Sequence, residues 1–312
     1  MAKPTPESFQ WRWCAPDYWH LWLLLGGMWL IARLSWRAQM VLGHALGSLL
    51  YQFVPSRRAT VFTNLAQAFP DMPPAQRREL ARAVFQETAK ALPETCVAWF
   101  GGLDRLEARV HIEGLEYLQA AVRQPQGTLL VGAHFSCIDI GGAYLGQVVP
   151  YASLQRPHNN PLMNWFQHRG RMRFVSALID RHDMRGMIKR LRQGEIIFYA
   201  PDQDLGRRHS QFVPFFGIQT ATVEATSRLL SLGRAKALLI SGGRTPTGYT
   251  LRVEPAPQLA QGHVYNELLA YNQWLEQRIL ADPKQYLWLH RRFKTRPEGE
   301  PAFYGTKDHS DL

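Results

Sequence analysis

The segment VGAHFSCIDIGGAYLG, residues 131–146, places a histidine and an aspartate five positions apart in an otherwise apolar stretch. A neutral imidazole is a base near pH 7, and a carboxylate beside it fixes its tautomer and stabilises its cation. The pair His134 and Asp139 therefore suits general-base chemistry, with a hydrogen-bonded core histidine as the alternative. Cys137 lies between them, but apolar neighbours raise a thiol pKa, so we interpret it as core filling rather than as a nucleophile.

Three further segments combine arginines with other polar residues: 167–174, 199–210 and 288–301. Arginine forks match the oxygens of phosphates and carboxylates, although such clusters also occur on ordinary solvated surfaces. Asp202 and Asp204 lie in the second segment, where no further ligand set accompanies them, so no metal site is predicted. The arginines that we take as candidate binding residues are Arg169, Arg171, Arg207, Arg208, Arg291 and Arg292.

The elements that must position these residues are predicted to form an α/β domain. Short apolar runs alternate with helical stretches such as 183–193 and 264–281, which predicts a mainly parallel sheet wrapped by helices. His134 follows the first run directly, at the carboxyl end of a strand, where open α/β sheets gather catalytic groups. On one continuous helix, side chains five positions apart lie on different faces. For the two to meet, we expect His134 in the turn and Asp139 in the first turn of the next helix. The apolar runs are 127–133, 148–155, 195–200, 235–241 and 249–254.

The N-terminal region predicts attachment to a membrane. Six of the ten tryptophans lie within residues 11–36, and residues 21–32 carry no charged or strongly polar side chain. Tryptophan favours the membrane–water interface. A helix over 18–36 reaches the ~20 residues of a membrane span only by including His20 and Arg33, so a helix lying in one leaflet is the alternative. A second helix is predicted over 38–54, and a hydrophobic hairpin of a soluble core is the competing interpretation.

Composition limits the remaining choices. The chain has 312 residues and a formal charge of +11, which indicates an anionic partner: nucleic acid, an anionic membrane surface, or a phosphorylated or acidic ligand. No groove-reading helix or aromatic–basic sheet is recognisable, so nucleic acid is not favoured. Three dispersed cysteines indicate neither a disulfide framework nor a cysteine zinc site. We predict membrane-anchoring helices over 1–56, an α/β domain over 57–304 with a helical region at 74–100 broken near Pro93, and a polar tail over 305–312.

Taken together, these segments resemble the late acyltransferases of lipid A biosynthesis in Gram-negative bacteria. A lone H-x4-D element, here 134–139, is weak support, but an ordered series along most of the chain is specific. That series also contains RRATVFTNLAQAFP (57–70), RPHNNPLMNWF (156–166), GMIKRLRQGE (186–195), YAPDQDLGRRHSQFVPFFG (199–217) and QYLWLHRRFKTRPEGEPAFY (285–304).

The resemblance implies a glycerolipid-acyltransferase-like sheet anchored on the cytoplasmic face of the bacterial inner membrane. It implies an acyl carrier protein thioester as donor, a hydroxyacyl chain of a lipid A precursor as acceptor, and no cofactor. His134 would be the general base and Asp139 would orient it, with Arg171 and Asp202 as further site candidates at family-matching positions. Two alternatives stay open: an acyltransferase acting on another glycolipid or a glycerophospholipid, and a non-catalytic scaffold that binds anionic lipid.

Overall fold

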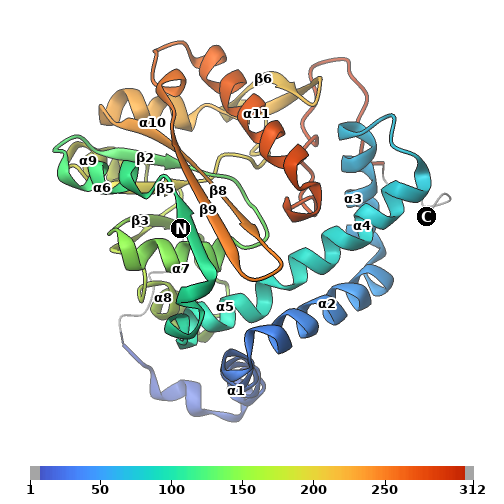
Figure 1. Ribbon diagram of the computed structural model, residues 1–312, viewed down its shortest axis with the longest axis vertical. Coiled ribbons are helices and arrows are strands. Elements are labelled where there is room, and N and C mark those ends of the chain that lie inside the picture. The colour runs from blue at the N-terminus through green and yellow to red at the C-terminus, as the bar shows by residue number, and fades with distance from the viewer. Residues whose placement is uncertain (1–7, 306–312) are drawn as a thin grey trace.

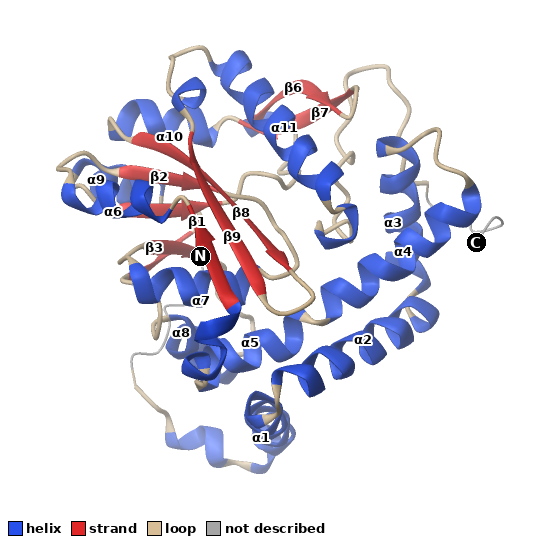
Figure 2. Ribbon diagram, viewed as in Figure 1, coloured by secondary structure: helices blue, strands red, loops and turns tan. Residues whose placement is uncertain are grey.

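A seven-stranded sheet forms the centre of the molecule in the computed structural model, which describes residues 8–305 (Figures 1 and 2). The strand order is β1-β9-β8-β2-β5-β3-β4, and every neighbouring pair is parallel except β8 and β9. The predicted α/β fold with a mainly parallel sheet is therefore confirmed. The strands are β1 (Val110–Glu113), β2 (Thr128–Val131), β3 (Ala152–Gln155), β4 (Ala177–Asp180), β5 (Ile196–Tyr199), β8 (Lys236–Arg244) and β9 (Tyr249–Pro255).

Helices surround this sheet, and a separate antiparallel hairpin of β6 (Ser210–Phe215) and β7 (Ile218–Val223) lies beside α11 (Figure 2). The helices are α1 (Trp19–Arg33), α2 (Trp36–Phe53), α3 (Pro55–Ala68), α4 (Pro74–Ala89), α5 (Ala91–Phe100), α6 (Leu115–Arg123), α7 (Ile138–Val148), α8 (Pro161–Arg171), α9 (Met184–Arg192), α10 (Ala225–Gly233) and α11 (Val264–Ala281). Short 3₁₀ helices lie at Trp11–Cys14, Pro16–Tyr18, Leu103–Arg109, Arg207–His209, Pro257–Leu259 and Pro283–Gln285.

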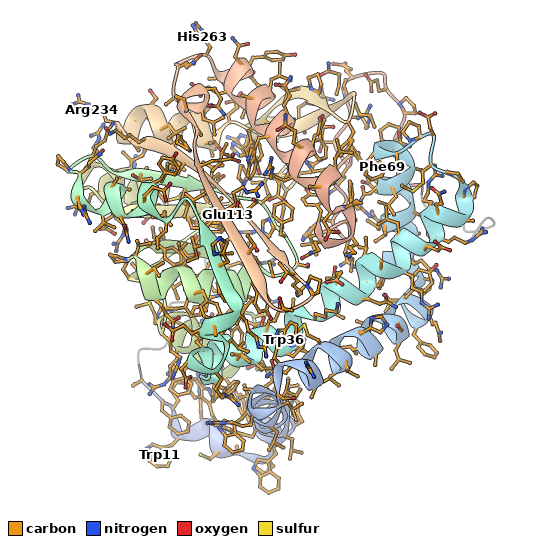
Figure 3. The ribbon with its side chains drawn as sticks, viewed as in Figure 1. Trp11, Trp36, Phe69, Glu113, Arg234 and His263 are labelled. Atoms are coloured by element: carbon orange, nitrogen blue, oxygen red, sulfur yellow. The ribbon has the colours of Figure 1, made fainter. Side chains whose placement is uncertain are left out.

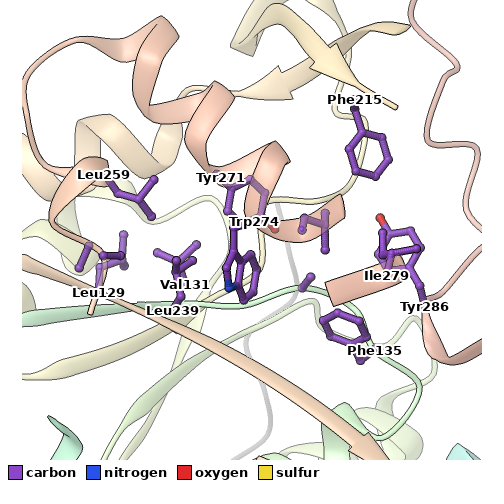
Figure 4. Close-up of a cluster of buried hydrophobic side chains, with 14 of the residues drawn as sticks. Leu129, Val131, Phe135, Phe215, Leu239, Leu259, Tyr271, Trp274, Ile279 and Tyr286 are labelled. Carbon is purple, nitrogen blue, oxygen red and sulfur yellow. The ribbon is translucent and has the colours of Figure 1, made fainter. Parts of the chain in front are cut away.

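The central strand β2 is buried on both faces, as its apolar sequence TLLV requires. Leu129 and Val131 point into the larger core, where side chains of α11 such as Tyr271 and Trp274 cover the sheet (Figure 4). Leu130 points to the other face and packs in a second cluster with residues of α6 and α7. The strand is therefore fixed between two helical layers, and its carboxyl end holds the following residues in a defined place.

The N-terminal region differs from the predicted continuous helix over 18–36. Leu34 is extended, and the Ser35 side chain accepts a hydrogen bond from the Ala38 N–H to start α2, so the stretch forms two separate helices. Gly43 and Gly47 let α2 approach α4 closely, because a Cβ at Gly47 would lie 2.4 Å from the Gln86 Cα. Within residues 8–305, no helix combines the length and the apolar character needed to cross a membrane.

Several other sequence predictions can be compared directly with the structure. The helix over 264–281 is found as α11, and the helical stretch 183–193 is found as α9, whose first turn Asp183 caps by accepting a hydrogen bond from Gly186 N–H. Helix 74–100 is broken at Lys90 rather than at Pro93, which is tolerated in the first turn of α5. The boundary at residue 56 falls within the first turn of α3 and stays a prediction, and residues 306–312 of the predicted tail lie outside the described residues.

Candidate active site

The carboxyl ends of β2 and β5 meet because the two strands are parallel neighbours in the sheet. His134 follows β2 by three residues, and Asp202 follows β5 by three residues. The His134 Nδ1 lies 2.6 Å from Asp202 Oδ1, and the His134 backbone N–H donates to Asp202 Oδ2 at 3.0 Å. The carboxylate therefore holds both the backbone and the ring of the histidine.

Burial and charge act in opposite directions on this pair. Burial of the ring favours its neutral form, but the Asp202 carboxylate outweighs that effect and raises the pKa of His134 above its ordinary value of 6.5. Burial alone would raise the pKa of Asp202, but the interaction with His134 lowers it. The Asp202 side chain is 2% exposed whereas that of His134 is 28% exposed, so solvent and ligands reach the imidazole and not its partner.

Asp139 lies in the first turn of α7, as the sequence predicted, but it does not pair with His134 in this structure. Its carboxylate accepts a hydrogen bond from Thr95 Oγ1 of α5 at 2.8 Å and one from Arg171 Nη2 of α8 at 3.3 Å. The first turn of α7 faces these two helices, whereas the imidazole Nδ1 faces the loop after β5. The carboxylate that contacts the imidazole is therefore that of Asp202 and not, as expected, that of Asp139. The negative charge of Asp139 still raises the pKa of His134, but without a hydrogen bond.

A cavity of about 710 Å³ opens beside the histidine. Its wall contains His134, Asp139 and Arg171, so the structure brings these three predicted residues to one site. Much of the remaining wall is apolar and comes from α7, from strands of the sheet and from the connection between α8 and β4. These apolar residues include Leu145, Val175, Phe198, Ile240 and Leu251.

The other predicted arginines do not line this cavity. Arg292 is 2% exposed, and its guanidinium donates to the Ala221 carbonyl oxygen at 2.8 Å, so it anchors β7 from inside the molecule. Arg207 donates to the Arg296 carbonyl oxygen at 2.8 Å. The remaining three are exposed: Arg169 over the Trp165 ring, Arg291 over the Tyr304 ring, and Arg208 on the 3₁₀ helix Arg207–His209.

Three contributors to the site were not predicted. Thr95 gave no signal in the sequence, because a threonine inside a helix is ordinary. Arg156 and Arg181 line the cavity and directly follow β3 and β4. Arg156 follows the predicted run 148–155, so the same strand-end reasoning that found His134 applies to it. Arg181 follows a strand that was not predicted. Within the described residues, no cluster of three or more His, Cys, Asp or Glu side chains could hold a metal ion.

Comparison with known proteins assigns the chain to a family. The profile of the bacterial lipid A biosynthesis acyltransferases matches residues 7–295. The chain belongs to this family. It is 38% identical to the lipid A biosynthesis palmitoleoyltransferase of Escherichia coli K12 over 295 residues, which cover 93% of this chain and 95% of that protein.

Other lipid A biosynthesis acyltransferases are similar over the same extent. The lauroyltransferase of Escherichia coli K12 is 38% identical, with 93% of this chain and 96% of that protein covered. The myristoyltransferase of the same organism is 28% identical, with 94% of this chain and 92% of that protein covered. The residues of the site, from Thr95 to Asp202, all lie within the region that matches the family profile.

Proposed function

We propose that this lipid A biosynthesis acyltransferase transfers a fatty acyl chain from an acyl carrier protein thioester to the hydroxyl of a hydroxyacyl chain on a lipid A precursor. His134 is the general base in this proposal, and Asp202 takes the orienting role that the sequence had assigned to Asp139. The observation that carries the proposal is the 2.6 Å contact between His134 Nδ1 and the buried Asp202, made at the wall of a largely apolar cavity.

The reaction follows from the arrangement of this pair. With Nδ1 directed at Asp202, the Nε2 of His134 is left to take the proton of the acceptor hydroxyl as its oxygen attacks the thioester carbonyl carbon. Asp202 stabilises the imidazolium that forms. The carbonyl oxygen gains negative charge, for which Arg171 offers donors from the cavity wall. When the tetrahedral intermediate collapses, the C–S bond breaks, and the imidazolium returns its proton to the leaving thiolate.

The cavity wall fits the two chemically different parts of the substrates. The apolar side chains on α7 and on the strands suit an acyl chain, which gains free energy by leaving water. Three arginines line the cavity: Arg156, Arg171 and Arg181. Guanidinium groups suit the phosphates of a lipid A precursor, and the charge of +11 favours an acidic carrier protein as the donor.

Attachment to the cytoplasmic face of the inner membrane belongs to the same proposal. Helices α1 and α2, at the bottom of Figures 1 and 3, carry a band of exposed apolar side chains, and such bands mark membrane or protein contacts. Arg33 lies over the Trp29 ring with its Cζ 5.0 Å from the ring centre, a pairing that suits the interface. The band contains Trp19, Leu23, Leu24, Trp29, Leu30, Leu34, Val41, Leu42, Leu49, Leu50 and Phe53.

One helix connects the layer that carries this band with the site. Helix α5 packs against both α1 and α7, so the helix that supplies Thr95 also contacts the membrane-facing layer. In this proposal, attachment of the protein to the membrane keeps the enzyme at the surface in which the lipid acceptor stays.

The proposal is tested with purified protein on phospholipid vesicles that contain a lipid A precursor. After addition of an acyl carrier protein thioester, mass spectrometry should detect the precursor with one further acyl group. A precursor that lacks hydroxyacyl chains is the matched control and should stay unchanged. Acylation of the vesicle phospholipids in place of the precursor would contradict the proposed acceptor, and transfer from a free fatty acid alone would contradict the thioester donor.

A further inference from the structure

A buried arginine lies under the loop that carries His134, and the proposed chemistry does not use it. Arg244 ends β8, and its side chain is 5% exposed. Its Nε donates to Glu94 Oε1 at 2.5 Å and its Nη2 donates to Glu94 Oε2 at 2.6 Å, which is a two-point pairing with a carboxylate that is 1% exposed. Such fork-to-carboxylate pairs fix orientation as well as distance.

The same guanidinium also donates hydrogen bonds to the 134–137 loop, which carries His134. Ser136 lies between His134 and Asp139, and it is 4% exposed. Arg244 Nη1 donates to Ser136 Oγ at 2.6 Å, and Nη2 donates to the Ser136 carbonyl oxygen at 2.9 Å. The loop therefore receives two hydrogen bonds from a side chain that Glu94 holds in place.

A second tie connects Arg244 to the loop through Gln285. The Arg244 backbone N–H donates to Gln285 Oε1 at 2.6 Å, and Gln285 Nε2 donates back to the Arg244 carbonyl oxygen at 2.9 Å. The Gln285 carbonyl oxygen accepts from the Ser136 N–H at 2.8 Å, and the Leu287 N–H donates to the His134 carbonyl oxygen at 3.0 Å. The loop is thus bounded by the 285–287 segment on one side and by the guanidinium on another.

The charges in this cluster balance. Arg244 also contacts Glu87, with Nη1 3.2 Å from Oε2, and Lys90 pairs with the same carboxylate at 2.6 Å. Burial raises the pKa of Glu94, and the neighbouring Arg244 guanidinium acts in the opposite direction. A buried ion pair is not needed for stability alone, since apolar side chains of similar volume serve as well or better. The arrangement instead suits a requirement for fixed geometry.

We propose that Arg244 and Glu94 form a positioning pair, which holds the 134–137 loop so that the His134 ring stays directed at Asp202 and at the cavity. The inference rests on the proposed acyl transfer and names two residues that act on it through the loop rather than by touching substrate. Helix α5 also positions a second residue of the site, because Thr95, next to Glu94, donates a hydrogen bond to Asp139 in the cavity wall.

The test compares Arg244→Lys with Arg252→Lys. Lysine keeps the positive charge but loses the fork, so it cannot hold both Glu94 and Ser136. Arg252 pairs with Glu113 at 2.6 Å between β9 and β1, its side chain is 47% exposed, and it serves as the matched control. We expect Arg244→Lys to lower kcat/KM about 10- to 100-fold, the size of effect that a 1 Å misplacement produces. The control should stay within about twofold of the wild type, as surface ion pairs contribute little.

The pH profile separates positioning from a mere loss of folded protein. When the rate at each pH is divided by the folded fraction at that pH, a mere loss of folded protein leaves the profile unchanged, whereas a displaced ring loses part of its contact with Asp202. Its pKa then falls, and the acid limb of kcat/KM moves to lower pH. The charged and titratable groups that face His134 are Asp202, Asp139, Arg171 and His290, and Arg244→Lys changes none of them.

Hydrogen exchange of the 134–137 amides gives a readout that needs no activity. In Arg244→Lys these amides should exchange faster while those of β2 stay protected, and that result would support the pair even if the wild type transferred no acyl group and the proposed function failed. Unchanged hydrogen exchange of these amides would overturn the inference, and so would a lower kcat/KM whose acid limb is not shifted. If Arg244→Lys does not fold, Ser136→Ala is the variant that tests the inference. It should move the acid limb to lower pH and lower kcat/KM roughly 3- to 10-fold. A wild-type pH profile in Ser136→Ala would overturn the inference.

Discussion

Replacing Asp202 with asparagine removes one negative charge from the site and keeps the size of the side chain. Asp202 makes a charge-assisted hydrogen bond to His134 Nδ1 at 2.6 Å and accepts a second from the His134 backbone N–H at 3.0 Å. The amide of asparagine can occupy the same space but cannot neutralise an imidazolium. The variant therefore isolates the contribution of the charge to the base.

The magnitude follows from that geometry. A hydrogen bond to a charged group is worth about 1.5–3 kcal/mol, and two opposite charges about 4 Å apart attract by about 4 kcal/mol in a medium of effective dielectric constant near 20. Asp202 is buried, so water screens the pair little. A loss of about 2–4 kcal/mol in transition-state stabilisation lowers kcat/KM roughly 30- to 1,000-fold.

The pH dependence has a defined sign. Because Asp202 raises the pKa of His134, the wild-type kcat/KM should fall on the acid side with a midpoint above the ordinary histidine value of 6.5. In Asp202→Asn that midpoint moves to lower pH. The difference in kcat/KM between the variant and the wild type therefore becomes smaller as the pH falls. The ion pair also stabilises the fold most between the ordinary values of 3.8 for aspartate and 6.5 for histidine, and this contribution is lost as the pH rises through the raised pKa of His134.

The assay is acyl transfer to a lipid A precursor, followed as initial rates from pH 5 to 9 (about the range in which histidine titrates). Asp204→Asn is the control, because Asp204 lies two residues away and accepts hydrogen bonds from Thr295 N–H at 2.7 Å and Oγ1 at 2.8 Å, outside the cavity wall. It should change stability more than rate. A folded Asp202→Asn enzyme with wild-type kcat/KM and an unmoved acid limb would refute the reasoning.

Other changes have equally definite outcomes. Arg171→Lys should lower kcat/KM roughly 10- to 100-fold in the same assay, because lysine lacks the fork that faces the cavity, whereas Arg169→Lys should keep near-wild-type kinetics. Leu23→Glu should reduce sedimentation with anionic phospholipid vesicles about 10-fold, as burying a leucine is worth about 1.5–3 kcal/mol, and Leu232→Glu on α10, 49% exposed, should not. Leu145→Phe narrows the apolar cavity, so in competition between two donors the preference should move toward the shorter acyl chain by roughly 10-fold, and an unchanged ratio would place the chain elsewhere.

Sequence reasoning located His134 and named Asp202 as a site candidate, but it chose Asp139 as the partner of the histidine for a physical reason. His134 was placed at the end of a strand because the apolar run before it ends in a turn. Asp202 likewise follows a predicted strand, over 195–200. Which strands are neighbours in a sheet is set by long-range packing, however, and β2 lies beside β5 although 64 residues separate Val131 and Ile196 along the chain. Without that neighbour relation, the carboxylate nearest in sequence was taken as the partner.

Two local features explain other differences. The hairpin of β6 and β7 turns at Phe216 and Gly217, both with positive φ, and a phenylalanine at φ 51° is not a residue that predicts such a turn. Tertiary contacts hold it there, since the Phe216 N–H donates to Glu276 at 2.7 Å and its ring packs on Phe69. At the N-terminus, apolar content alone extended one helix through Ser35, where the hydroxyl caps the next helix instead.

The most direct test of the account is acyl transfer by His134→Gln, which keeps a polar side chain at the wall of the cavity but removes the base. The measurement is the initial rate of acylation of a lipid A precursor by an acyl carrier protein thioester, with Gln203→Ala in the same wall as a control for local disturbance. The account predicts a loss of about 10²- to 10⁴-fold in kcat for His134→Gln, the range that general-base catalysis contributes. A folded His134→Gln enzyme that transfers the acyl group at the wild-type rate would contradict it.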